Sequence, residues 1–397
     1  MAVPFYETNS VRMRQAIYKL FIIVNKIALG TLLIAYLAPE VSPSVTWIPA
    51  FFGLAYPVFF LVNVFFVVFW ILKWKWAFLI SLPVLLLNHT YTNNVIRISF
   101  PPITQEAGVK LFSYNVRMFD LYMWSGYRYT RSRAINFVIS ERPDIAFFQE
   151  YYSKTNKPTS PSVRFETELG LNYNYISQKT KDADRGLAIF SRYPIIYQEL
   201  AHRDGHCYAM IADIVIGDDT IRCINVHLQS VGFTNTNYNY IDSLGLQNEN
   251  LTHTGAVAIS NKLRLAFEKR TFQANQIKFL IENSPYKIIV AGDFNDTPNS
   301  YTYHRIRGKL RDAFVECGSG FGASYERFGF PLRIDYFMAD SNLHFKNLRN
   351  YDVDYSDHHP ISTTIGFAST GTQVGAGQLK FVFPDFRNNV LHYDIPK

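Results

Sequence analysis

Cysteine is scarce in this chain of 397 residues, and its distribution argues against a cysteine metal site. The three cysteines are Cys207, Cys223 and Cys317, an odd number with no pair at the close spacing of zinc ligands. We therefore expect buried thiols within strands. One disulfide stays open as an alternative if the domain faces an oxidising compartment, so cysteine alone does not identify the compartment.

Charge is also scarce, above all in the first third of the chain. The whole chain has 39 Lys or Arg and 32 Asp or Glu; residues 1–90 contain six and two of them, which leaves 33 and 30 for the rest. The larger part is thus only about +3 and has no basic stripe interleaved with aromatic residues. This balance argues against tight binding of duplex nucleic acid.

Two long apolar segments near the N-terminus predict membrane spans. Residues 50–72 lie in a region without charge and exceed the roughly 20 residues needed to cross a bilayer. Residues 20–38 predict an earlier span, although Asn25 and Lys26 interrupt it; Lys26 can extend its amine to the interface. The recurrence of apolar segments and the lack of a small-residue cleavage site argue against a cleaved signal peptide.

A third apolar segment, residues 76–91, is short and contains Pro83. It is either a third span or a re-entrant or interfacial segment. Basic residues flank the first two spans on one side only, while the loop 39–49 has none; they are Arg12, Arg14, Lys19, Lys73 and Lys75. This asymmetry predicts a cytoplasmic N-terminus. With three spans, the protein is a multi-pass membrane protein whose domain after residue 92 lies on the extracytoplasmic, periplasmic side.

From Val109 onward, short strand-like segments alternate with helical or polar ones, which predicts an α/β sandwich. The predicted strands are 109–116, 145–150, 186–195, 208–216, 221–228, 287–295, 333–339 and 361–367. The predicted helices are 132–144 and 262–282, with a hairpin turn at 217–219 and a long loop at 229–261. We expect a membrane region at 1–92, a catalytic domain at 105–367, and a linker and tail at 368–397.

Polar residues stand where these buried strands emerge, which is where open α/β sheets gather ligand sites. They are Asn115, Glu150, His227, Asp293, Asn295, Asp335, Asp357 and His358. Mg²⁺ prefers oxygen ligands, so Glu150 and Asp357 are candidate metal ligands, with Mn²⁺ as an alternative metal. Asn115 and Asn295 can donate amide hydrogens to phosphoryl oxygens without adding a charge.

The remaining four residues can carry the proton transfers of phosphate ester hydrolysis. His358 can take a proton from water, with Asp335 fixing its tautomer. Asp293 can align the water, and His227 can protonate the leaving oxygen. His359, next to His358, is expected to have a structural or substrate-edge role only.

The motifs SYN, FQE, RGLAIFSRYPI, NVHLQS, GDFN, RIDY and SDHHP, in this order, resemble the endonuclease/exonuclease/phosphatase superfamily with the deoxyribonuclease I-like fold. The resemblance covers about residues 109–367. It implies a four-layer α/β sandwich and Mg²⁺-dependent hydrolysis of phosphodiesters or phosphomonoesters. It also implies roles in phosphate binding for Asn115 and Asn295, in metal binding for Glu150 and Asp357, in alignment for Asp293, and in base catalysis for Asp335 with His358.

The substrate is less defined. His227 in NVHLQS departs from the apurinic-site repair branch and is similar to the deoxyribonuclease, sphingomyelinase and inositol-phosphatase branches; HLQS resembles the sphingomyelinase form. A membrane-tethered site meets lipid headgroups at high effective concentration. We therefore expect a membrane-anchored phosphoesterase that acts on a lipid headgroup or another small phosphodiester. The alternatives are an extracytoplasmic nuclease acting on DNA or RNA, and a non-catalytic membrane subunit that uses the fold as a binding module.

Overall fold

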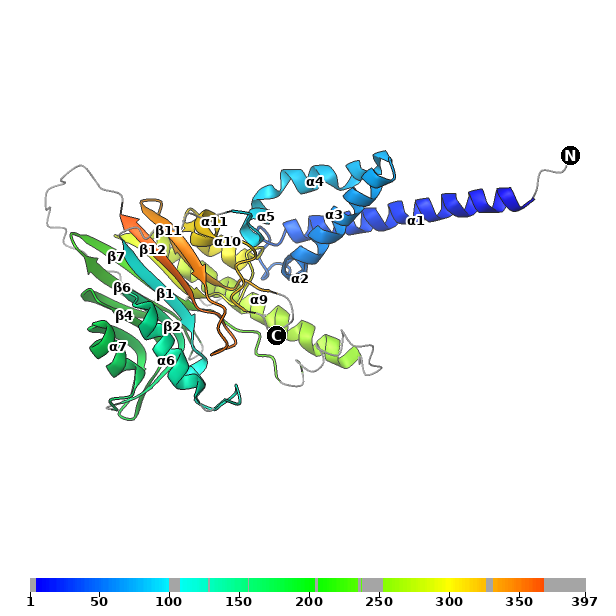
Figure 1. Cartoon of the computed structure of the whole chain (residues 1–397). Helices are drawn as coiled ribbons and strands as arrows, with labels where there is room; N and C mark the ends of the chain where they lie inside the picture. The colour runs from blue at the N-terminus through cyan, green and yellow to red at the C-terminus, as the bar shows by residue number, and fades with distance from the viewer. Residues whose placement is uncertain are drawn as a thin grey trace. The chain divides into compact units, whose positions relative to one another are not determined.

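The computed structural model describes residues 5–99, 108–127, 129–155, 157–203, 206–234, 237, 253–325 and 331–367. It contains two six-stranded sheets with helices on their outer faces and a set of N-terminal helices (Figure 1). The four-layer α/β sandwich expected from the sequence is thereby confirmed. The predicted linker and tail, 368–397, lie outside the described residues.

The first sheet has the strand order β11-β12-β1-β2-β4-β3. Its central pair, β1 and β2, is parallel, and the other neighbours are antiparallel. The strands are β1 (Val109–Asn115), β2 (Ile145–Lys154), β3 (Tyr173–Lys179), β4 (Ala183–Ser191), β11 (Leu343–Asn350) and β12 (Ile361–Phe367).

The second sheet has the order β5-β6-β7-β8-β10-β9 and repeats this plan, with β7 and β8 as its one parallel pair. The strands are β5 (Ile195–Arg203), β6 (His206–Ile216), β7 (Asp219–His227), β8 (Lys287–Asp293), β9 (Arg311–Asp312) and β10 (Asp335–Ala339). The predicted hairpin is confirmed, because Ile216 pairs with Asp219 across a turn in which Gly217 has a φ of +60°.

Three apolar layers hold the sandwich together, because alternate residues of each strand point to opposite faces of its sheet. The layer between the sheets includes Leu111, Phe147, Met210 and Ile289. Phe112 and Phe148 point the other way, under α6 (Thr130–Glu141) and α7 (Pro161–Leu169). On the far side, α9 (His253–Glu282) and α10 (Tyr301–Arg307) cover the second sheet.

Some element boundaries differ from the prediction. The helix predicted over 262–282 begins at His253, so the expected loop 229–261 is wrong over its last nine residues. Residues 235–236 and 238–252 of that loop lie outside the described residues. Strand β2 continues past Glu150 to Lys154. All three cysteines are free; Cys207 and Cys223 lie in β6 and β7 as expected, but Cys317 ends the short helix α11 (Ala313–Cys317).

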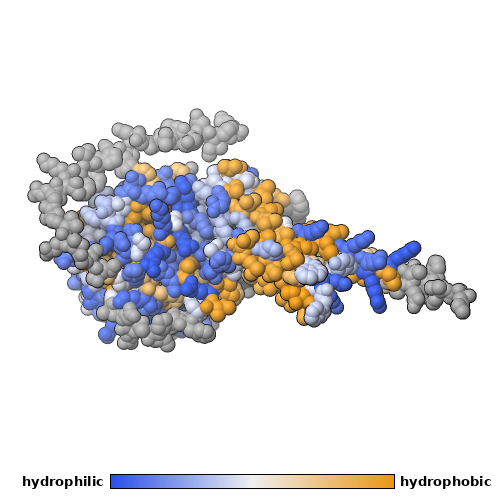
Figure 2. All heavy atoms as spheres, turned by 90° about the horizontal axis from the view of Figure 1, so that it is seen from above, coloured by the Kyte–Doolittle hydropathy of each residue, from blue (hydrophilic) through white to orange (hydrophobic). Residues whose placement is uncertain are grey.

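The N-terminal region begins with α1 (Phe5–Tyr36), of which Val11–Tyr36 is long and apolar enough to cross a membrane. The predicted span 50–72 is not one straight helix. It breaks at Ala55 into α2 (Ile48–Leu54) and α3 (Tyr56–Leu72), which meet at 69°. Pro57 in the first turn of α3 explains the break, because proline lacks an amide hydrogen and restricts the residue before it. Apolar residues gather over these helices, with hydrophilic ones at the far end of α1 (Figure 2).

The third apolar segment, 76–91, does not form a continuous helix. It is divided among a 3-10 helix, η1 (Trp76–Ile80), and the short helices α4 (Leu82–Leu87) and α5 (His89–Val95). The prediction of a third spanning helix is therefore not supported by an unbroken helix among the described residues.

Polar residues inside the apolar segments form a buried hydrogen-bond network. Asn25 of α1 donates to Ser81 (2.7 Å) and accepts from the Trp70 indole (2.9 Å). Ser81 in turn donates to Asn63 of α3 (2.8 Å), whose amide donates to the Ala28 carbonyl (2.9 Å). Asn25, which interrupts the predicted first span, is thus a packing residue that joins three segments, as polar residues do between helices in membranes.

The N-terminal helices contact the sandwich through specific polar groups. The Asn299 side chain donates to the Ala35 carbonyl at the end of α1 (3.1 Å). Buried Arg333 donates to the Asn94 carbonyl in α5 (2.8 Å). A Cβ atom at Gly53 in α2 would lie 2.6 Å from the Asn299 carbonyl oxygen, so this close approach requires glycine. The N-terminal helices therefore pack against the sandwich beside the segment after β8 that contains Asn299.

Candidate active site

The two parallel strand pairs bring the predicted residues to one edge of the sandwich. Asn115 ends β1, His227 ends β7 and Asp293 ends β8. Asp335 begins β10, and because β10 is antiparallel to β8, Asp335 lies directly opposite Asp293. His358 precedes β12, which is antiparallel to β1. The polar strand ends therefore converge, as the sequence predicted.

Gly292 allows β8 to deliver Asp293 to this edge. Its φ of +128° lies outside the range of other residues, and a Cβ atom there would lie 2.1 Å from the Val226 carbonyl oxygen of β7. Only glycine fits between β7 and Asp293. The glycine of the GDFN motif thus has a structural reason that is independent of substrate.

The position of Glu150 in its strand differs from the predicted one. It does not end its strand; it lies in a bulge of β2, where the register with β4 shifts between Phe148 and Tyr151. Its φ of +49° is rare for a residue with a side chain. Bulges redirect side chains, and strained backbone clusters at functional sites. The bulge presents the Glu150 carboxylate to the cavity described below, where Glu150 is 37% exposed.

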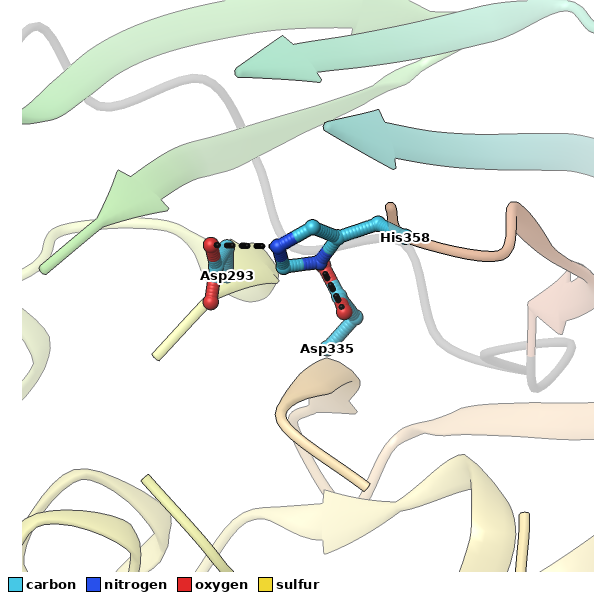
Figure 3. A group of neighbouring side chains, drawn as sticks. All are labelled: Asp293, Asp335 and His358. Carbon is cyan, nitrogen blue, oxygen red and sulfur yellow. Dashed lines mark hydrogen bonds and ion pairs between the residues drawn. The ribbon is translucent and has the colours of Figure 1, made fainter. Parts of the chain in front are cut away.

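His358 lies between two aspartates from the second sheet (Figure 3). Its Nδ1 atom is 2.9 Å from Asp335 Oδ2, and its Nε2 atom is 3.6 Å from Asp293 Oδ2. All three residues are buried. The first contact is a hydrogen bond that fixes the ring, so Nε2 is the nitrogen directed at Asp293.

Burial and charge set the protonation of this cluster. Burial alone lowers the pKa of the His358 imidazolium, but the Asp335 and Asp293 carboxylates outweigh it and raise that pKa to about 10. Burial raises the pKa of Asp293 to about 6, against the opposing effect of His358. The cluster thus stabilises an imidazolium, which is the form that His358 takes after accepting a proton.

The two asparagines hold Asp293 in place. Asn115 Nδ2 donates to Asp293 Oδ2 (3.1 Å) and to Glu150 Oε1 (3.4 Å), which links the two sheets. Asn295 donates its backbone N–H to Asp293 Oδ1 (2.7 Å) and its side-chain amide to Asp293 Oδ2 (3.1 Å). Asn295 also has a positive φ, +52°. Both side-chain amides therefore donate to carboxylates at this edge of the sandwich.

His227 completes the group from β7. Its Nε2 atom is 3.7 Å from Glu150 Oε1 and 3.8 Å from Asp293 Oδ2. The position is within reach of a group bound between these carboxylates. Asp357 lies next to His358 in sequence, with its Oδ2 atom 3.6 Å from Arg117 Nε.

The oxygen donors of the site suit a hard divalent cation. Glu150 and Asp357, the predicted ligands, both line the same cavity as Asp293, so three carboxylates gather in one place. Among the described residues, Asp293, Asp335 and His358 have potential ligand atoms within 4.8 Å of one another. The hydrogen bond to Asp335 occupies His358 Nδ1, so this nitrogen is not available as a metal ligand. The donor set of Glu150 and Asp357 fits Mg²⁺ better.

These side chains open into a cavity of about 440 Å³. The predicted residues that line it are Glu150, His227, Asp293, Asn295, Asp357 and His358. Asn115 and Asp335 lie behind them and act on the cavity through Asp293 and His358. His359 does not line the cavity; its N–H donates to the Ser324 carbonyl (2.7 Å).

Sequence reasoning missed two supporting pairs. Gln149 donates to Asn225 (2.7 Å), and Asn225 donates to the Phe148 carbonyl (3.0 Å), a buried bridge between the sheets. Arg270 of α9, buried in the cavity wall, donates to Asp296 (3.1 Å). Two features of the sequence could have indicated these pairs. Gln149 and Asn225 are polar residues inside apolar strands, and Arg270 lies on the apolar face of a helix.

The sequence matches two family models. Residues 112–358 match the endonuclease/exonuclease/phosphatase family, and residues 18–95 match a domain of unknown function (DUF8431). No curated protein matches the chain.

The solved structures that the chain matches share little sequence with it. A Leptotrichia buccalis protein of the endonuclease/exonuclease/phosphatase family is 14% identical (TM-score 0.44), covering 65% of this chain and 100% of its own. Truncated Caenorhabditis elegans TDP2 is 18% identical (TM-score 0.43), covering 66% of this chain and 97% of its own. The Neisseria 3′ phosphatase NExo is 13% identical (TM-score 0.43), covering 65% of this chain and 100% of its own. The assignment rests on the family model: the chain belongs to the endonuclease/exonuclease/phosphatase family, whose enzymes are metal-dependent phosphoric ester hydrolases.

Proposed function

We propose that this protein is a membrane-anchored, Mg²⁺-dependent phosphoesterase that hydrolyses the phosphodiester of a lipid headgroup or another small phosphoester. The observation that carries the proposal is the buried chain Asp335–His358–Asp293 at the wall of a cavity that Glu150 and Asp357 also line. A buried, oriented imidazole beside a carboxylate-rich pocket is the arrangement that general base catalysis requires.

Each side chain has a defined task in this proposal. His358 Nε2 accepts a proton from water that Asp293 aligns, and Asp335 stabilises the resulting imidazolium. Asn295, which lines the cavity, donates an amide hydrogen to a phosphoryl oxygen, and Asn115 orients Asp293 and Glu150 from behind the cavity wall. His227 protonates the leaving oxygen. Glu150 and Asp357 would hold the metal. When bound, the cation neutralises phosphate charge, and its positive charge favours the neutral form of His358 that can accept a proton.

Membrane anchoring is supported by α1 and by the outer surface of the helices. The exposed large apolar side chains there include Leu20, Ile27, Leu61, Phe65 and Leu72. From Lys19 to Tyr36, α1 rises about 26 Å, close to the roughly 30 Å of a bilayer core. We assign the membrane region to residues 1–92, the catalytic domain to 105–367 and a linker and tail to 368–397.

The multi-pass topology and the orientation are further parts of the proposal. The buried Asn25–Ser81–Asn63 network ties η1 and α4 to α1 and α3, which supports a broken third pass. Arg12, Arg14 and Lys19 lie in the N-terminal half of α1, and Lys73 and Lys75 follow α3. The opposite end of α1, at Ala35, and the helix α5, at Asn94, contact the sandwich. The positive-inside rule then puts the catalytic domain on the periplasmic side.

Headgroup release by the detergent-purified full-length protein tests the proposal. The substrates are phospholipid vesicles, sphingomyelin, inositol phosphates, plasmid DNA and oligonucleotides, each with Mg²⁺ and with EDTA, and the control is His358→Ala. We expect Mg²⁺-dependent release from a lipid that His358→Ala abolishes. Cleavage of nucleic acid alone would overturn the lipid assignment, and equal rates with EDTA would overturn metal dependence.

A further inference from the structure

The cavity has a second, apolar part that the hydrolytic residues do not use. Besides the polar set, it is lined by side chains from α9, from α2 and from the segments 230–233 and 331–334. The apolar lining residues include Leu54, Val231, Ile259, Leu263, Phe267 and Leu332. A water-soluble headgroup has no need of such a wall.

Helix α9 arranges this wall as a row that leads to the hydrolytic residues. Ile259, Leu263 and Phe267 are spaced four residues apart, so they lie on one face of the helix. The row is about 12 Å long, from a rise of about 1.5 Å per residue. One turn further, Arg270 lies beside Asp296, directly after Asn295. The apolar row is therefore continuous with the site that binds the phosphate.

Among the described residues that line the cavity, none is an exposed lysine or arginine. Arg270 is the one Lys or Arg there, and it is 1% exposed and paired with Asp296 (3.1 Å). Its second contact is the Gln229 carbonyl (2.9 Å). An arginine neutralised in this way does not attract a second phosphate, so the wall favours an uncharged, apolar group.

The N-terminal helices contribute to the same wall. Leu54, the last residue of α2, lines the cavity, and Phe51 packs edge-on against Phe267 (5.4 Å between ring centroids). These helices also expose the apolar surface shown in Figure 2. The apolar part of the cavity is thus continuous with the helices that the proposed function assigns to the membrane.

We propose that this apolar wall binds a hydrocarbon chain of the substrate, so that the substrate is an amphiphilic phosphoester held by its chain as well as by its phosphate. The inference rests on the proposed function and makes it narrower. A substrate recognised by its headgroup alone would show no preference for chain length.

A series of alkyl p-nitrophenyl phosphodiesters, from methyl to hexyl, tests this inference below the critical micelle concentration. Each methylene buried on the wall raises kcat/KM by up to about fourfold, so we expect an increase of about tenfold or more from methyl to hexyl. Leu263→Gln should remove most of this increase and leave the methyl ester rate within about twofold.

Leu265→Gln is the matched control, because Leu265 is the same residue type on the same helix but is 55% exposed and does not line the cavity. Partition of longer esters into detergent affects all variants alike. Only a loss of chain-length dependence specific to Leu263→Gln therefore supports the inference.

A binding measurement separates this inference from the proposed function. Hexyl phosphate and methyl phosphate are titrated by calorimetry into His358→Ala with Mg²⁺. Hexyl phosphate should bind more tightly than methyl phosphate, and adding Leu263→Gln should remove this difference. That result supports chain binding by the wall even if no ester is hydrolysed; in that case only the proposed function fails. Two results would overturn the inference that the wall binds a hydrocarbon chain. One is hydrolysis by wild type with no dependence on chain length. The other is oligonucleotide cleavage that is faster than hexyl ester cleavage and that Leu263→Gln leaves unchanged.

Discussion

Replacing Asp335 with asparagine isolates the proton-transfer role of the site, because Asp335 touches His358 but does not line the cavity. The two side chains are 2% and 7% exposed, and their atoms are 2.9 Å apart. Asparagine keeps the shape but removes the charge that stabilises the imidazolium, and its NH2 group replaces one of the two acceptor oxygens, so the tautomer of His358 is no longer fixed. We expect kcat to fall by about 10²–10⁴-fold, which is the contribution of a positioned base, with KM nearly unchanged.

The assay is steady-state hydrolysis of methyl p-nitrophenyl phosphate at saturating Mg²⁺. Asp340→Asn is the control, since Asp340 follows the same strand and accepts a hydrogen bond from the Ile288 N–H (2.8 Å) far from the cavity. Asp335→Asn retaining more than about a tenth of the wild-type kcat would refute the assigned role. A rise in KM with an unchanged kcat would refute it as well, because it would indicate a binding role.

Three further predictions follow from other contacts. Glu150→Gln should raise the Mg²⁺ concentration for half-maximal rate by about tenfold or more; an unchanged Mg²⁺ titration would exclude Glu150 as a ligand. Gly292→Ala should destabilise the protein by about 3 kcal/mol or more, whereas Gly170→Ala, which also has a positive φ but open space around it, should cost about 1 kcal/mol; equal losses of Tm in the two variants would contradict this. Burial, with Arg307 adding to it, lowers the pKa of His304 to about 4. The folded state therefore binds fewer protons than the unfolded state between about pH 4 and 6.5, so up to about 3 kcal/mol of stability present above pH 6.5 is lost as the pH falls to 4. His304→Gln should lose less Tm on acidification, and an identical loss would contradict the assignment.

The sequence predicted the convergence of these polar residues because strand ends are marked by local pattern. Apolar runs that stop at Asn115, His227 and Asp293 identify residues at the carboxyl ends of strands, and the parallel pairs bring those ends together. The last strand, 361–367, was predicted at its observed bounds. These features depend on residue order alone.

Other features could not be read from local pattern, because distant contacts determine them. Glu150 follows an apolar run like the others, but pairing with β4 keeps it inside a longer strand as a bulge. Helix α9 begins at His253 and places Ile259 in the lining of the cavity, whereas the Gly, Ser and Thr residues around it obscure the helical period in the sequence. The break at Ala55 depends on Pro57 together with the close contact of Gly53 with Asn299.

The hydrolytic role of the buried cluster is tested most directly by initial rates of methyl p-nitrophenyl phosphate cleavage by the full-length protein, with Mg²⁺ and with EDTA, for wild type and His358→Ala. We predict cleavage that needs both Mg²⁺ and His358, with a loss of about 10²-fold or more when either is removed. Equal rates in wild type and His358→Ala would contradict the account, since His358 would then carry no proton in the reaction.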